Sequence, residues 1–224
     1  MAIVKVTAAE FKKFAARARP DYRDYLTANL SKVLEDYGIN RNSLRLCHFM
    51  AQIGHGCGLF TLRRENLNYK TTKQLLKIFG VGNHSAKITA AEAKSLIGEP
   101  KKLAERVYGL ENSKKAKELG NTKPGDGYKF RGAGFLQITG RDSYTRHGAA
   151  IGVDLTDDAD LAADAKNSLF LACEEWREKK CNKLADSDNL RALTKAVNGG
   201  INGLKERRAL YSAAKKIWGD KLPE

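Results

Sequence analysis

Frequent start and stop signals for helices are the feature that most constrains the fold of this sequence. In a capping box, a threonine hydroxyl and a carboxylate or amide three residues later satisfy N–H groups at the start of a helix. Three such boxes occur: Thr7-x-x-Glu10, Thr71-x-x-Gln74 and Thr89-x-x-Glu92. Glycines that can end a helix in the left-handed conformation follow five helical patterns: Gly38, Gly80, Gly98, Gly109 and Gly120.

These signals predict a mainly α protein built from many short helices. We expect the helices to cover residues 8–18, 22–37, 43–54, 72–79, 90–97, 100–108, 114–119, 142–150, 158–164, 167–180, 187–197 and 203–217. No repeat, low-complexity tract or linker interrupts them, so we expect a single domain over residues 1–224.

The stretch NTKPGDGYKFRGAGFLQITG, residues 121–140, has a different character. Its glycines break any helix, and the residues between them predict short strand-like pieces. These pieces are expected at Tyr128, Phe130, Phe135 and Ile138. A long loop inside a helical protein is usually functional, so this segment is a candidate for the site.

The charge of the chain limits the partners that it can attract. Lys and Arg number 40 against 26 Asp and Glu, for a formal charge of +14. Such a field attracts nucleic acid, anionic lipid, or a bacterial cell wall with its peptide carboxylates and acidic polymers. Basic runs such as KKLAERVYG have apolar residues at helical spacing, so each is also explained as the solvated face of a helix. Charge alone leaves these alternatives open.

Targeting and metal-binding signals are weak. MAIVKVTAAEFKKF lacks the apolar core of about 7 to 15 residues that a secretory signal needs, and no run of about 18 apolar residues predicts a membrane span. The cysteines form no Cys-x-x-Cys pair and would stay reduced in a cytosolic chain: Cys47, Cys57, Cys173 and Cys181. A zinc site that combines Cys47 and Cys57 with His48 and His55 is disfavoured, because residues 47 and 48 are helix neighbours that point apart. We expect no metal and no cofactor.

The most specific motif is GDGYKFRGAGFLQITGRDSY, residues 125–144. It is not a dinucleotide fingerprint, because Gly132-x-Gly134 lacks a third glycine and does not lie between a strand and a helix. It resembles the Tyr-Arg-Gly-x-Gly-x-x-Gln-Leu/Ile-Thr-Gly-Arg-x-Asn-Tyr motif of glycoside hydrolase family 19, the chitinases and phage endolysins of lysozyme-like fold. Phe130 replaces the tyrosine, and the other matches are Arg131, Gly132, Gly134, Gln137, Ile138, Thr139, Gly140, Arg141 and Tyr144.

Two further blocks resemble the same family. HFMAQIGHGCGLFTLRRENLNY, residues 48–69, is similar to Ala-Gln-x-x-His-Glu-Ser/Thr-Gly-Gly-Phe followed by Glu-Asn-Leu-Asn-Tyr. TKAVNGGINGLKERRALY resembles the family's Asn-Gly-Gly segment with its downstream arginine, at Asn198 and Arg207. The three blocks lie in the family's order over about residues 45–211. The resemblance implies an α+β lysozyme-like fold, helical and bilobed, with the Gly-rich segment lining a cleft.

The resemblance also implies a reaction. An inverting glycosidase needs an acid for the leaving oxygen and a base for a water on the opposite face of the sugar, with the carboxyls about 6.5 to 9.5 Å apart. Carried over from the family, Glu65 is the base, Thr139 holds the water, and Gly56 occupies the position of the acid. Glycine cannot protonate anything, which removes a contribution of about 10² to 10⁴ in rate. Glu105 or Glu111 is a less favoured source of the proton.

The resemblance places further candidate sugar-binding residues in the three blocks: His55, Asn68, Tyr69, Gln137, Ser143, Asn198 and Arg207. Ala133 and Ser143 depart from the family, which often has Arg and Asn there. Structural alternatives remain for several positions. Glu65 could pair with a neighbouring arginine, His55 could brace the helix end, and the amides of Gln137 and Asn198 could serve the backbone. Trp176 and Trp218 are expected in the core.

The function predicted from the sequence is that of an endolysin-type hydrolase of β-1,4 bonds in peptidoglycan, impaired by Gly56. We expect a monomer that binds no nucleic acid, stays in the bacterial host cytoplasm until lysis, and then acts on the cell wall. The alternatives are a chitinase, although chitin is uncharged and gives the positive charge no purpose, and a peptidoglycan-binding relative without catalysis. A nucleic-acid protein would need a basic face with stacking aromatics.

Overall fold

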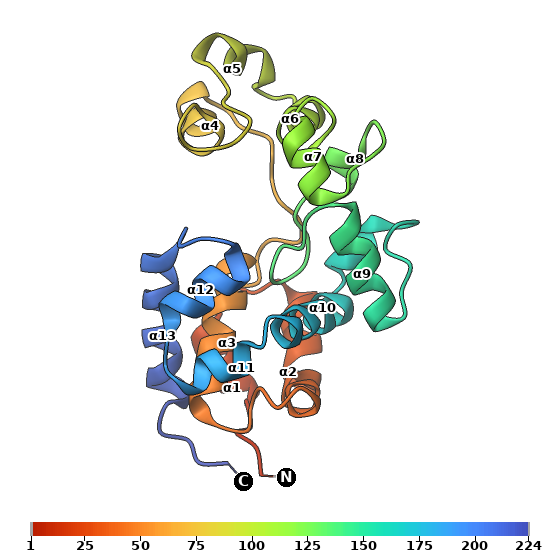
Figure 1. Ribbon diagram of the computed structural model, residues 1–224. Helices are drawn as coiled ribbons and strands as arrows, with labels where there is room; N and C mark the ends of the chain where they lie inside the picture. Colours follow the sequence, from red (N-terminus) through yellow and green to blue (C-terminus); the bar gives the residue numbers. More distant parts are fainter. Residues whose placement is uncertain (1, 224) are drawn as a thin grey trace. The chain divides into compact units, whose positions relative to one another are not determined.

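Helices dominate the protein. The computed structural model describes residues 2–223, which form two compact units (Figure 1). Unit 1 contains the chain up to Arg63, Gly134–Gln137, and Ala162 onward, and unit 2 contains Arg64–Ala133 and Ile138–Leu161. Within the described residues, β-structure is limited to isolated bridges. The prediction of a mainly α, lysozyme-like fold is confirmed.

Unit 1 is a bundle around one large apolar core. Its helices are α1 (Ala8–Phe14), α2 (Pro20–Asp36), α3 (Ser43–Gly56), α10 (Ala165–Glu178), α11 (Cys181–Asp186), α12 (Leu190–Asn198) and α13 (Leu204–Trp218). Helix α3 packs along α13, and α2 packs against α10. The rings of Phe60 and Phe135 meet edge to face with centroids 5.1 Å apart, so the loop at residue 135 is part of this core. Trp176 and Trp218 are fully buried, as predicted.

Local signals explain where the first helices begin. Thr7 and Glu10 form the complete capping box of α1. Proline stands at the first position of α2, where its missing N–H costs nothing. Asn42 caps α3 by accepting a hydrogen bond from the backbone N–H of Arg45.

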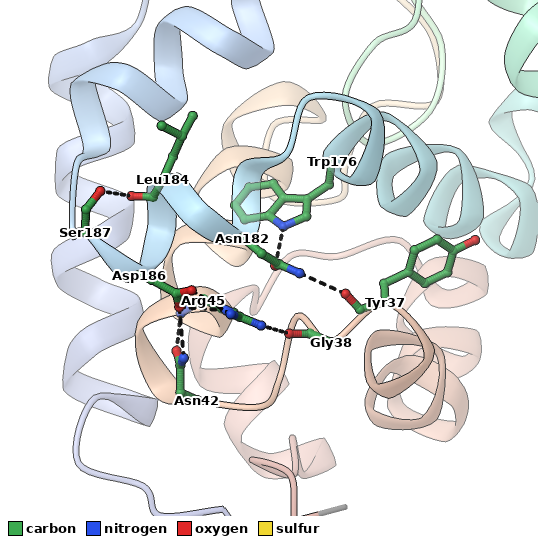
Figure 2. Close-up of polar contacts among 9 residues, drawn as sticks. All are labelled: Tyr37, Gly38, Asn42, Arg45, Trp176, Asn182, Leu184, Asp186 and Ser187. Carbon is green, nitrogen blue, oxygen red and sulfur yellow. Dashed lines mark hydrogen bonds and ion pairs between the residues drawn. The ribbon is translucent and has the colours of Figure 1, made fainter.

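A polar network ties α11 to the segments around it (Figure 2). The indole Nε1 of Trp176 donates to Asn182 Oδ1 at 2.8 Å, and Asn182 Nδ2 donates to the carbonyl oxygen of Tyr37 at 2.9 Å. Arg45 on α3 donates to the carboxylate of Asp186 and to the carbonyl of Gly38. Asn182 therefore satisfies two polar groups that would otherwise be left without partners at the edge of the core.

Unit 2 has a smaller core of its own. Its helices are α4 (Thr72–Phe79), α5 (Ala90–Leu96), α6 (Pro100–Tyr108), α7 (Ser113–Leu119), α8 (Asp126–Lys129) and α9 (Arg141–Ile151). A 3₁₀ helix, η1 (Ala159–Ala163), follows α9. Leu75, Phe79, Leu103 and Val107 form the centre of the core. No helix within residues 2–223 is both long and apolar enough to span a membrane.

The structure corrects several details of the sequence analysis. Three of the predicted strand-like pieces are wrong: Tyr128 lies in α8, Phe130 caps that helix, and Phe135 lies in a turn. At Ile138 the prediction agrees with the structure, since this residue forms an antiparallel bridge with Ala133. Helix α8 packs closely on α6 at Gly127, where a Cβ would lie 2.6 Å from the carbonyl oxygen of Ala104. The chain can therefore pack as a turn of helix against α6.

Other differences concern helix ends. The helix expected over residues 8–18 ends at Phe14, and the helix expected over 187–197 is α12, preceded by a separate α11. Lys180 separates α10 from α11 with a φ of +53°, a conformation that a lysine does not signal in a sequence. Gly38, Gly98 and Gly120 have positive φ as expected, whereas Gly80 and Gly109 are extended.

We predict that Asn182→Ala lowers the free energy of unfolding by about 1–3 kcal/mol, because the Trp176 indole and the Tyr37 carbonyl lose their partner. Urea denaturation monitored by far-UV circular dichroism measures it. Ser187→Ala is the control, since that exposed hydroxyl bonds a carbonyl of its own helix and should change stability by less than about 0.5 kcal/mol. Equal effects of the two substitutions would contradict the assigned role of Asn182.

Candidate active site

Three short segments of unit 2 pair as a minimal antiparallel ribbon, which we call the ribbon: residues 64–65, 132–133 and 138–139. Ala133 bridges Arg64 on one side and Ile138 on the other. The Glu65 N–H donates to the Gly132 carbonyl at 2.8 Å, and Ala133 and Ile138 exchange hydrogen bonds of 3.2 and 3.0 Å. The next row of the ribbon is therefore Glu65, Gly132 and Thr139.

This row brings the predicted base and the predicted water-holding hydroxyl to one face. Residues of one row point to the same face of an antiparallel pair, and neighbouring strands lie about 4.8 Å apart, so the backbones of Glu65 and Thr139 are about 10 Å apart. The residue between them is Gly132, which has no side chain. No side chain of Gly132 therefore stands between Glu65 and Thr139, and both residues are partly exposed.

The Glu65 carboxylate is held by unit 2. Its Oε1 accepts a hydrogen bond of 2.9 Å from the hydroxyl of Tyr108, the last residue of α6. Burial raises the pKa of Glu65, and the Tyr108 hydroxyl, the Gly132 backbone N–H and the charge of Arg131 lower it in part. Burial and the nearby Glu65 carboxylate also raise the pKa of Tyr108, which therefore keeps its proton. A carboxylate with raised proton affinity in a partly open site is suited to proton abstraction.

The alternative that Glu65 pairs with a neighbouring arginine is wrong in this structure. Arg63 pairs with Asp21, and Arg64 pairs with Asp160. Glu65 therefore takes its hydrogen bonds from Tyr108 and from the backbone of Gly132.

The other candidates of unit 2 occupy different settings. Tyr69 is half-buried, packs edge to face on Phe79 at 5.8 Å, and has its pKa raised by burial and by the charge of Glu65. Asn68 is exposed just before it. Ser143 lies on α9, where its hydroxyl is 3.1 Å from Nδ1 of His147. Tyr69 is therefore the candidate whose proximity to Glu65 the structure supports.

In unit 1, Gly56 is the last residue of α3 and has no room for a side chain. A Cβ at this position would lie 2.3 Å from the carbonyl oxygen of Phe135. That carbonyl belongs to a loop whose ring is anchored in the core. Any residue with a side chain at position 56 therefore requires the Phe135 loop to move.

One turn before Gly56, Gln52 holds a buried cation. Arg207 on α13 is 4% exposed and donates through Nη1 to the side-chain oxygen of Gln52 and, at 3.3 Å, to its carbonyl. Its Nε has no hydrogen-bond partner, and no carboxylate among the described residues pairs with it. Burial lowers the pKa of Arg207 to about 10. The guanidinium is thus desolvated without a compensating negative charge.

His55 lies beside this cation. Its pKa is lowered by burial and by the charge of Arg207, and its Nδ1 is buried without a hydrogen-bond partner. The ring lies against Gly203, the residue before α13, where a Cβ would be 2.3 Å from His55 Nε2. Gly203 also has a φ of +72°, so both the backbone and the imidazole require glycine there. The bracing role considered for His55 agrees with this packing.

The remaining candidates of unit 1 differ in exposure. Gln137 is half-buried, has a φ of +56°, and donates from Nε2 to the carbonyl of Gly134 at 2.8 Å. At least one N–H of the Gln137 side-chain amide is therefore used in a hydrogen bond to the backbone. Asn198 ends α12 and is exposed.

No zinc site forms from the residues considered for one. The thiol of Cys57 donates to the Ile53 carbonyl, and His48 bonds Asp188 at 2.8 Å and stacks on Tyr211. Within residues 2–223, no cluster of His, Cys, Asp and Glu could hold a metal ion.

Sequence reasoning missed two residues of these sites. Tyr108 reaches Glu65 from 43 positions along the chain, and Gln52 reaches Arg207 from 155 positions. Gln52 lies in a matched motif without a role assigned to it, whereas Tyr108 lies in none.

Comparison with solved structures defines the class of fold. Chitinase C from Streptomyces griseus HUT6037 superposes with a TM-score of 0.61 at 14% identity, covering 100% of this chain and 96% of that one. A bacterial family 19 chitinase gives a TM-score of 0.61 at 16% identity, over 98% and 97% of the two chains. The class IV chitinase of Zea mays gives 0.55 at 17% identity, over 98% and 94%. The fold is that of family 19 chitinases.

Sequence similarity adds the family. A glycosyl hydrolase family 19 domain-containing protein of Haemophilus influenzae is 34% identical over 177 residues, which are 77% of this chain and 79% of that protein. No protein-family model matches the chain. The chain belongs to glycoside hydrolase family 19.

We predict that Glu65→Gln stabilises the protein at pH 7 more than at pH 4. The folded-state pKa of Glu65 is raised above 4.5, so the wild-type protein loses stability as the pH rises from about that value through the raised pKa. Glutamine keeps an acceptor for Tyr108 and removes the charge that burial penalises. Urea denaturation at the two pH values measures the difference.

The control for this prediction is Glu118→Gln on α7. The Lys115 ammonium lowers the pKa of that exposed carboxyl, so its loss should not stabilise the protein at pH 7. If the stability change caused by Glu65→Gln had the same pH dependence as that caused by Glu118→Gln, the raised pKa assigned to Glu65 would be contradicted.

Proposed function

We propose that this protein is an endolysin-type hydrolase of β-1,4 glycosidic bonds in bacterial peptidoglycan, acting with inversion and impaired by Gly56. Glu65 is the base that activates water, Thr139 holds that water, and position 56 is the place of the acid. Tyr69, Asn68, Ser143, Gln137 and Asn198 are proposed contacts to the glycan. The protein would reach the wall when the host cell lyses.

The row Glu65, Gly132 and Thr139 carries this proposal. It puts an ionisable oxygen and a hydroxyl on one face of the ribbon, with a residue lacking a side chain between them. A water between the two groups could donate to the carboxylate and accept from the hydroxyl. Inverting hydrolysis requires such a water beside the base.

The buried guanidinium of Arg207 supports position 56 as the place of a lost carboxylate. Arg207 bonds Gln52, and residues four apart on a helix share a face, so a carboxylate at position 56 would extend toward the same cation. It would supply the negative charge that Arg207 lacks among the described residues. We interpret the uncompensated charge as what remains of an acid–arginine pair.

The choice of peptidoglycan rests on charge. A net charge of +14 favours a polymer with peptide carboxylates over a neutral one. Chitin is the second candidate, because the solved structures of similar fold are chitinases. A glycan-binding protein without catalysis is the third, because Gly56 supplies no acid.

We predict that Gly56→Glu raises the rate of glycan cleavage by about 10² to 10⁴, the usual contribution of a general acid. Mass analysis of fragments from purified peptidoglycan, with chitin oligomers assayed in parallel, measures it. The variant should release muropeptides with a new reducing end, and the double variant with Glu65→Gln should release none. Peptidoglycan should be cleaved faster than chitin.

Gly56→Ala and Gly56→Gln are matched controls. Both push on the Phe135 carbonyl as the glutamate does, but neither carries an acid. If Gly56→Glu folds and releases no more sugar fragments than these two, the proposed place of the acid is wrong. If only the chitin oligomers are cleaved, the substrate is chitin and the proposal of peptidoglycan is wrong.

A further prediction concerns stability and needs no substrate. At pH 7, Gly56→Glu should be more stable than Gly56→Gln, because only the glutamate compensates Arg207. The pKa of a carboxyl paired with a guanidinium is lowered, so this advantage should be lost as the pH falls through the titration of the carboxyl. Thermal denaturation at pH 7 and pH 3 tests it. Equal stability at pH 7 would show that position 56 does not face the cation.

A further inference from the structure

Unit 2 contains a second site, a pocket of about 590 Å³, which lies among α6, α8 and the segment around η1. A pocket of this volume accommodates a small peptide or metabolite. It is lined by Arg64, Lys101, Glu105, Gly125, Tyr128, Lys129, Arg131, Asp157, Asp158, Ala159 and Asp160.

Two arginines of the pocket belong to the face of the ribbon opposite Glu65. Side chains alternate along paired segments, so the side chains of Arg64 and Arg131 point to the face opposite the one of Glu65 and Gly132. Arg64 accordingly donates to the Lys129 carbonyl at 2.5 Å, to the Tyr144 hydroxyl at 3.2 Å and to the Asp160 carboxylate. The proposed catalytic residues and the two arginines of the pocket therefore use opposite faces of the same ribbon.

The inner wall of the pocket contains a guanidinium with spare donors. Arg131 stacks on the ring of Tyr128, with its Cζ 3.9 Å from the centroid, and donates from Nη1 to the Tyr128 carbonyl at 2.8 Å. Its other N–H groups donate to no described residue. Burial and the charge of Arg64 lower the pKa of Arg131. The Nζ of Lys101 lies 5.9 Å from the same ring centroid and adds a second cation, which forms no ion pair with a described residue.

Carboxylates balance these cations. Asp157 and Asp158 are exposed and form no ion pair with a described residue, and Oε1 of Glu105 is buried without a hydrogen-bond partner. In total the wall has four cationic and four acidic side chains. This equality disfavours a polyanion such as nucleic acid.

We propose that this pocket binds a zwitterionic peptide, with a carboxylate on Arg131 and Lys101 and an ammonium against Asp157 and Asp158. Resting on the proposed function, the peptide is the stem peptide that peptidoglycan carries and chitin lacks. Tyr128 supplies the apolar wall of the pocket. Binding in this pocket would hold the peptidoglycan through its stem peptide while the glycan chain lies on the other face of the ribbon.

The test uses a synthetic tetrapeptide, L-Ala-γ-D-Glu-meso-diaminopimelyl-D-Ala, titrated by calorimetry into the 224-residue chain. Lys101→Gln and Asp157→Asn should each weaken binding about tenfold, the usual effect of losing one charge-assisted hydrogen bond. Lys94→Gln and Glu111→Gln, at exposed positions of unit 2, are charge-matched controls and should leave binding unchanged.

Modified peptides identify which charge meets which side chain. Amidation of the terminal carboxylate should cost about tenfold with the wild-type protein and much less with Lys101→Gln. Acetylation of the side-chain amine should behave in the same way with Asp157→Asn. Undetectable binding at millimolar peptide, or equal losses in the pocket and control variants, would overturn the proposal.

The assay separates the two proposals because it needs no cleavage. If the peptide fails to bind while Gly56→Glu cleaves peptidoglycan, the proposed peptide site is wrong and the proposed hydrolase function stands. Specific peptide binding without any cleavage would support the pocket and favour a wall-binding protein.

Discussion

The hydrogen bonds that join residues 64–65, 132–133 and 138–139 into the ribbon are the constraint on which the rest of unit 2 depends. Ala133 bridges both neighbours, and the Glu65 N–H donates to the Gly132 carbonyl. Because side chains alternate, one face receives Glu65 and Thr139, and the other receives the two arginines of the pocket. A slip of one residue in this pairing would exchange the two faces.

Two buried charges show where the protein gives up stability for a site. Glu65 is partly desolvated and has a raised pKa, although Tyr108 and the Gly132 N–H bond it. Arg207 is 4% exposed and is hydrogen-bonded to Gln52, an amide that brings no charge. Isolated charges of this kind are costly and are usual at functional sites. Arg207 is bonded to Gln52, one helical turn before Gly56, the residue at which we propose that an acid is missing.

Much of the fold could be predicted from local signals, because caps and glycine stops act within a few residues. Thr7 and Gly120 mark helix ends in the structure as their residue types predict. Asn112 caps the start of α7 in the same local way, although the sequence analysis does not name it. What could not be predicted depends on distant contacts. The close packing of Gly127 in α8 on α6 joins distant segments, and the hydroxyl of Tyr108 comes from a helix that no motif connects with Glu65. The three family blocks gave candidate residues, but not the burial of Arg207 or the closeness of Phe135 to Gly56.

The central claim is that Glu65 and Thr139 share one face of the ribbon with room for a water between them. A high-resolution crystal structure of this chain tests it most directly. We predict one ordered water within about 2.6–3.2 Å of both a Glu65 carboxylate oxygen and Oγ1 of Thr139. A Glu65 carboxylate on the face of Arg64, or a protein side chain filling the space over Gly132, would contradict the account.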